Sequence, residues 1–211
     1  GVAPATEVAR GLRIPAPVTS NGDTRKQLNK LVSERLGRQG DYVRNVSSSI
    51  VFLDDAAFPA KISEADAELY VAAAMKSSGF RTAYTKQELA DGEVPPTPMG
   101  RMMANSYSPL GGWWVMGVTD PFTLDRKSGT NHGLGYSYDQ HVPLAFYGPV
   151  FRAGVYRDQV EPIDLAPTLA VLLGINKPNS ASGRVLTEAL MPAGAPAVAN
   201  PPPRARPGAR P

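Results

Sequence analysis

Apolar residues recur every three to four positions in several stretches of the chain, which is the spacing of one face of an α-helix. The first helix is expected from Asp23 to Leu36, followed by Gly37, a residue type that often closes a helix. The clearest helix runs from Ser63 to Gly79, with acids in its first turn and a lysine in its last. Shorter helices are predicted at 86–90 and 99–106, and an apolar, buried helix at 163–174.

Short apolar runs between these helices have the length and the boundaries of buried strands. They lie at residues 49–53, 80–85, 112–118, 142–147 and 154–160. Neighbouring side chains of a strand point to opposite faces, so Trp113 and Trp114 are expected on opposite faces of the sheet, with at least one in the core. The alternation of strands and helices indicates an α/β fold with helices on both faces of a sheet.

The composition separates a globular body from a tail. Of the 211 residues, 42% are hydrophobic, which is enough to bury a core. Residues 191–211 are rich in Pro, Ala and Arg and are predicted to be disordered, so the folded part is expected at 1–190. The three arginines of that tail account for the net charge of +3, and the neutral body argues against nucleic-acid binding. No apolar run approaches the about 18 residues that a membrane span needs.

The two histidines, His132 and His141, lie close together in the sequence. His132 stands in the segment Gly129-Thr-Asn-His-Gly133, where glycines allow a sharply turned loop that a metal or ligand can approach. Histidine is the commonest metal ligand and also an ordinary polar residue, so both interpretations stay open at this point. His141 leads directly into the predicted strand 142–147, which favours a packing or capping role. Because the chain has no cysteine, any zinc site must use His, Asp or Glu.

A few other polar residues are weaker candidates. Asp54 and Asp55 follow the predicted strand 49–53, where they could bind a metal, although such acids more often form hydrogen bonds with the following turn. Ser48, Ser49 and Thr130 could each be proposed as a nucleophile, but none has a neighbouring base in the sequence. A polar strand or turn role is the better interpretation of these three.

Four segments of the chain carry a resemblance to one known superfamily. They are Gly129-Thr-Asn-His-Gly133, Tyr138-Asp-Gln-His-Val-Pro-Leu144, Val160-Glu-Pro-Ile-Asp-Leu-Ala-Pro-Thr-Leu-Ala-Val-Leu-Leu-Gly-Ile175 and Gly183-Arg-Val-Leu186. These segments resemble the C-terminal part of the alkaline phosphatase superfamily, in particular the secreted phosphatases related to type I phosphodiesterases and nucleotide pyrophosphatases. The resemblance is good over about residues 99–190 and loose before them. It implies part of an α/β/α sandwich around a mixed, mostly parallel sheet.

In this superfamily the histidine of the Thr-x-His-Gly motif is a zinc ligand, so the resemblance implies that His132 binds zinc. It gives Asp139 and His141 structural roles, and it places Asp164 and Thr168 on a packed helix as non-catalytic residues. The implied activity is the hydrolysis of small-molecule phosphoric esters with two zinc ions, through a Thr or Ser phosphoenzyme. The implied location is periplasmic or secreted.

The superfamily's nucleophile, its early Asp ligand and its Asp-x-x-x-His and Asp-His-Gly motifs have no counterpart in the chain, which has no histidine before His132. The opening Gly1-Val-Ala-Pro4 is similar to the residues that follow the Asp-His pair, so the nucleophile is expected upstream of Gly1. We therefore expect a C-terminal fragment that supplies one metal ligand and scaffold and is inactive alone. The alternatives are a non-catalytic α/β binding or interaction module, and a sulfatase or phosphoglycerate-mutase-like member of the superfamily.

Overall fold

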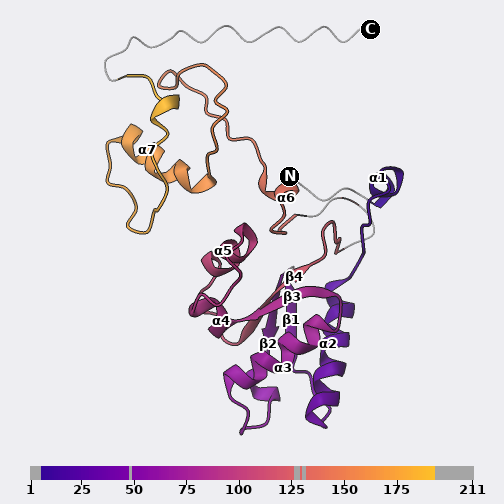
Figure 1. Cartoon of the computed structure of the whole chain (residues 1–211). Helices are drawn as coiled ribbons and strands as arrows, with labels where there is room; N and C mark the ends of the chain where they lie inside the picture. Colours follow the sequence, from indigo (N-terminus) through magenta and orange to yellow (C-terminus); the bar gives the residue numbers. More distant parts are fainter. Residues whose placement is uncertain (1–5, 48, 126–128, 130–131, 193–211) are drawn as a thin grey trace, which may run out of the picture. The chain divides into compact units, whose positions relative to one another are not determined.

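The computed structural model describes residues 6–47, 49–125, 129 and 132–192. The chain divides into two compact units, unit 1 at residues 1–142 and unit 2 at residues 143–211 (Figure 1). The assignment of 1–190 to one catalytic domain stays a prediction, and most of the predicted disordered tail, 193–211, lies outside the described residues. No described helix is long and apolar enough to cross a membrane.

Unit 1 is built on a four-stranded sheet in the order β1-β2-β4-β3. The predicted strands at 49–53, 80–85 and 112–118 are confirmed as β2, β3 and β4. The first strand, β1, was not predicted, because only Val43 and Val46 of its residues are apolar and buried, and two polar residues separate them. The strands are β1 (Val43–Ser47), β2 (Ile50–Leu53), β3 (Phe80–Thr85) and β4 (Trp114–Thr119).

Every neighbouring pair in this sheet is antiparallel, so the expectation of a mostly parallel sheet is wrong for the described residues. A parallel pair needs a crossover that returns the chain to the end at which the first strand began. Here β1 and β2 are joined by two residues, which reverses the chain at once. The longer connection after β3 also returns to the end of β3, where Thr85 pairs with Val115 of β4.

Helices cover both faces of the sheet, which confirms the expected α/β/α layering. On one face α2 (Asn21–Leu36) and α3 (Glu64–Lys76) pack through Leu28, Val32 and Val71 against Val51 and Val115 of the sheet. On the other face α4 (Lys86–Ala90) and α5 (Pro98–Asn105) form a second core with the strand side chains that alternate with the first set. As predicted, Trp113 packs on the first core and Trp114 in the second.

The helix boundaries follow the capping residues of the sequence. Ser20 and Ser63 begin α2 and α3, each accepting a hydrogen bond from a backbone N–H of the first turn. Gly37 closes α2 in the left-handed conformation, with φ +65°. Thr85 and Glu88 form a reciprocal capping box that begins α4 directly at the end of β3.

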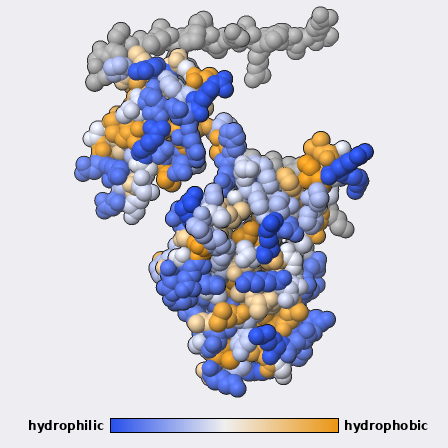
Figure 2. Space-filling view, viewed as in Figure 1, coloured by the Kyte–Doolittle hydropathy of each residue, from blue (hydrophilic) through white to orange (hydrophobic). Residues whose placement is uncertain are grey.

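Unit 2 contains the helix α7 (Leu165–Leu173), preceded by the short 3₁₀ helix η2 (Pro162–Asp164) and followed by η3 (Thr187–Ala189). The predicted helix at 163–174 is therefore confirmed, but its complete burial is wrong, since Val171 is 57% and Leu173 69% exposed. The buried residues of α7 are Pro167, Thr168 and Ala170. Figure 2 shows hydrophobic surface interspersed with hydrophilic surface on both units.

The predicted strands at 142–147 and 154–160 are absent: these described residues form no ladder, and Tyr147 and Val155 are 82% and 85% exposed. An apolar run becomes a strand only where a partner strand satisfies its backbone groups, and Pro143 cannot donate one of those bonds. Among the described residues of unit 2, strand-like pairing is limited to one isolated antiparallel bridge, between Phe151 and Leu190.

Candidate functional site

His132 lies on the loop that connects β4 to the short helix α6 (Ser137–Gln140), and its side chain is exposed. Gly129 and Gly133 both have positive φ, at +81° and +102°, so the glycines around His132 are used for a turned backbone, as expected. Residues 126–128, 130 and 131, and with them the candidate Thr130, lie outside the described residues.

The entry to this loop is tied to the N-terminal segment of the chain. Leu124 is 1% exposed and forms a parallel bridge with Val18. Its N–H donates to the Pro17 carbonyl at 2.8 Å, and its carbonyl accepts from the Thr19 N–H at 2.8 Å. The first helix, α1 (Thr6–Gly11), precedes this segment. The N-terminal part of unit 1 and the entry of the His132 loop therefore lie side by side.

The exit of the loop is held by side chains of α6 and its flank. The Leu134 N–H donates to Oδ2 of Asp139 at 2.8 Å, and the Tyr136 hydroxyl donates to the Thr119 carbonyl, at the end of β4, at 2.7 Å. Gln140 donates to the Gly135 carbonyl at 3.2 Å. Asp139, which the resemblance gave a structural role, thus binds the backbone two residues after His132.

Two partly buried tyrosines, Tyr136 and Tyr138, form hydrogen bonds in this region. Burial raises the pKa of Tyr136 and of Tyr138 above the ordinary phenol value of 10.0, so both keep their hydroxyl proton at physiological pH. The guanidinium of Arg81, whose Nη1 lies 3.8 Å from Oδ1 of Asp120, acts in the opposite direction on Tyr136 but is the smaller influence. The hydrogen bonds of these two tyrosine hydroxyls are therefore made by neutral groups near pH 7.

His141 lies at the end of α6, where its backbone N–H donates to the Ser137 carbonyl at 3.0 Å, and its side chain is exposed. The buried strand that it was expected to precede is not formed. The sequence gives no indication of the tyrosine contacts around α6, because they join residues of β4 and α6 that come together only in the fold.

The weaker candidates are engaged with the backbone. Asp54 caps the 3₁₀ helix η1 (Asp55–Ala57) by accepting from the Ala56 N–H at 3.2 Å. The Ser49 carbonyl accepts from the Gly117 N–H, and Ser48 lies outside the described residues. Asp164 accepts from the backbone N–H groups of Glu161 and Arg184, which hold the pKa of its carboxyl below the usual value.

The described residues do not by themselves fit a zinc site. A catalytic zinc takes about three protein ligands. Within the described part of the chain no three His, Asp or Glu side chains come together in a way that could hold a metal ion. The zinc ligand predicted at His132 therefore stays a prediction, since no such group is found around it among the described residues.

Comparison with known proteins gives relatives that include two alkaline phosphatases. Alkaline phosphatase PafA of Elizabethkingia meningoseptica is 25% identical over 175 residues, which cover 80% of this chain and 31% of PafA. A protein of Myroides odoratus described as a calcium-transporting ATPase is 29% identical over 171 residues, covering 79% of this chain and 31% of that protein. Alkaline phosphatase PhoV of Synechococcus elongatus is 36% identical over 62 residues, covering 29% of this chain and 11% of PhoV. No family model matches the chain.

The crystal structure of wild-type PafA shares the fold with a TM-score of 0.76 at 22% identity, over 90% of this chain and 36% of that one. A crystal structure of a PafA mutant gives a TM-score of 0.74. The chain thus spans about a third of the length of the proteins that it matches over most of its own length. In sequence the chain is similar to part of these alkaline phosphatases, and it shares the fold of the corresponding part of PafA.

Proposed function

We propose that this chain is the C-terminal part of a zinc-dependent phosphatase that hydrolyses small-molecule phosphoric esters, and that His132 is its contribution to the metal site. The observation that carries the proposal is the match in sequence and fold to about a third of alkaline phosphatase PafA. A periplasmic or secreted location follows from the same resemblance. Nucleic acid is not an expected partner, since the body of the chain has no net basic charge.

The surroundings of His132 support its role as a ligand. Its imidazole is exposed on a glycine-flanked loop, where a metal can approach it. The pairing of Pro17–Thr19 with Leu124 brings the N-terminal segment to the entry of the same loop. We expect the remaining ligands to come from residues that precede Gly1 in a longer protein.

The reaction itself depends on groups that this chain does not supply. The nucleophile, a Thr or Ser, and the remaining ligands of two zinc ions are expected upstream of Gly1. The chain alone is therefore expected to be inactive and to act as scaffold. The Myroides relative is described as a calcium-transporting ATPase, a name that also implies cleavage of a bond to phosphorus, although of an anhydride and not of an ester.

The test begins with the coding sequence directly upstream of the Gly1 codon. We expect an Asp-His pair immediately before Gly1, and a Thr or Ser nucleophile with further Asp ligands earlier. The longer product should hydrolyse p-nitrophenyl phosphate, lose this activity to a chelator and regain it with zinc, while the 211-residue chain shows none. A start codon at this position, or hydrolysis by the 211-residue chain alone, would contradict the proposal.

A further inference from the structure

The entry and the exit of the His132 loop meet in a stack of three aromatic rings. The ring of Phe122, which follows β4, lies 4.4 Å from the ring of Tyr138 in α6, with 16° between their planes. The Tyr136 ring lies 5.8 Å from that of Tyr138 at 12°. Phe122 and Tyr138 are 16 positions apart, so this contact closes the base of the loop.

Phe122 holds an unusual backbone conformation at this base. Its φ is +62°, in the left-handed region that bulky residues rarely adopt. Such a conformation persists only where the surrounding contacts hold it, and it recurs at functional sites. Here the Phe122 N–H donates to the Tyr138 hydroxyl at 2.7 Å, in addition to the ring contact. One residue later the Thr123 hydroxyl donates to the Asp120 carbonyl at 2.7 Å, which closes the turn.

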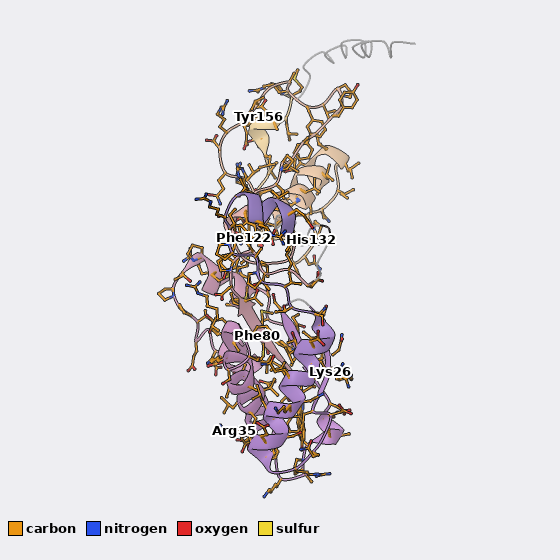
Figure 3. The ribbon with its side chains drawn as sticks, turned by 90° about the vertical axis from the view of Figure 1, so that its right-hand side faces the viewer. Lys26, Arg35, Phe80, Phe122, His132 and Tyr156 are labelled. Atoms are coloured by element: carbon orange, nitrogen blue, oxygen red, sulfur yellow. The ribbon has the colours of Figure 1, made fainter. Side chains whose placement is uncertain are left out.

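The direction in which the chain leaves β4 is therefore set at Phe122. Leu124, two residues further on, is buried and paired with the N-terminal segment, so the chain enters the His132 loop from a defined position. Figure 3 labels Phe122 and His132 at the same end of unit 1, away from Arg35 at the end of α2. Tyr138 thus contacts the residue from which the loop starts and belongs to the helix at which it ends.

We propose that Tyr138, acting through Phe122, is a positioning residue for His132. The hydroxyl and the ring of Tyr138 hold Phe122 in its left-handed conformation, which sets the direction in which the chain enters the loop that carries His132 and so positions the imidazole. The proposal rests on the proposed function only for the use of His132 as a metal ligand. The positioning itself is a property of the 211-residue chain and is measurable without metal.

The experiment is NMR of the whole chain with ¹³C-labelled histidine, in which the two ring signals are assigned with His141→Gln. Tyr138→Phe keeps the ring stack and removes the acceptor of the Phe122 N–H. Phe122→Gly allows the left-handed backbone but removes the ring and the restraint. In both variants we expect the single Cε1–Hε1 signal of His132 to shift and to broaden or split into two or more.

Tyr42→Phe is the matched control. The Tyr42 side chain is fully buried in the core between α2 and the sheet, and its hydroxyl donates to the Arg38 carbonyl at 2.8 Å. Its loss should lower the melting temperature and leave the His132 signal in place. An unchanged His132 signal in Tyr138→Phe and Phe122→Gly overturns the proposal, as does an equal change in Tyr42→Phe. Because no zinc is involved, this failure is distinguishable from a failure of the proposed function.

Discussion

Glu68 of α3 accepts a hydrogen bond from the backbone N–H of Lys86, the first residue of α4, at 2.9 Å. Oε2 of Glu68 accepts this bond, whereas Oε1 has no hydrogen-bond partner among the described residues. Glu68 is only 1% exposed, so the carboxyl is buried. Lys86 in turn places its ammonium 2.7 Å from the carboxylate of Glu64, one turn before Glu68. Burial raises the pKa of Glu68 to about 7.

This pKa predicts a pH-dependent stability. Between pH 4.5, the ordinary value for the carboxyl in the unfolded chain, and about 7, the folded chain keeps a proton that the unfolded chain has lost. The free energy of unfolding should therefore fall as the pH rises through this range, by up to about 3 kcal/mol, and level off above it. Glu68→Gln should lose this slope and be more stable than the parent at pH 8, with little difference at pH 5.

Urea unfolding at pH 5 and pH 8 measures this difference. Glu93→Gln is the control, because Glu93 is exposed and its substitution should act alike at both pH values. A Glu68→Gln effect that is the same at pH 5 and pH 8 would show that the buried carboxyl is not the origin of the slope.

Gly117 of β4 lies where side chains of α3 and β3 pack closely on the sheet. A Cβ on this residue would lie 2.5 Å from Cε of Met75 and 2.5 Å from Cδ1 of Phe80, both in the packed core. Gly117→Ala should therefore lower the free energy of unfolding by about 1–3 kcal/mol. In Gly22→Ala, near the start of α2, the nearest atom is 4.0 Å away, so thermal unfolding should show no loss. Equal melting temperatures of the two variants would refute the close packing.

Thr168 joins two segments of unit 2 that are 18 or more residues apart in the sequence. Its fully buried hydroxyl donates to the Asp164 carbonyl at 2.7 Å and accepts from the Leu186 N–H at 3.0 Å. Thr168→Val removes both bonds and should cost about 1–3 kcal/mol. Amide hydrogen exchange at Leu186 measures this locally: exchange should accelerate in Thr168→Val and stay slow in Thr168→Ser. Slow exchange in both variants would mean that the hydroxyl does not hold this segment.

The elements that the sequence predicted correctly are those specified by local chemistry. The caps Ser20, Ser63 and Gly37 define their helices without reference to the rest of the chain. The direction of the strands is different, because it depends on which strand the chain returns to, and no local pattern records that. The run 142–147 has strand composition, yet its described residues meet no partner strand.

The candidate site divides in the same way. The loop carrying His132 was recognised from its glycines and its motif, both local features. The ties that hold the loop, from Leu124 to Pro17 and from Tyr138 to Phe122, join residues far apart in the sequence and could not be predicted from it. The metal site itself stays a prediction, because the described residues supply one candidate ligand.

The zinc content of the longer protein, with and without His132, tests the central claim most directly. If His132 is a zinc ligand, His132→Ala should lose about one equivalent of bound zinc, together with most of the phosphatase activity. His141→Ala is the control, and it should keep its zinc while losing stability. Unchanged zinc content and turnover in His132→Ala would contradict the assignment of this loop to the metal site.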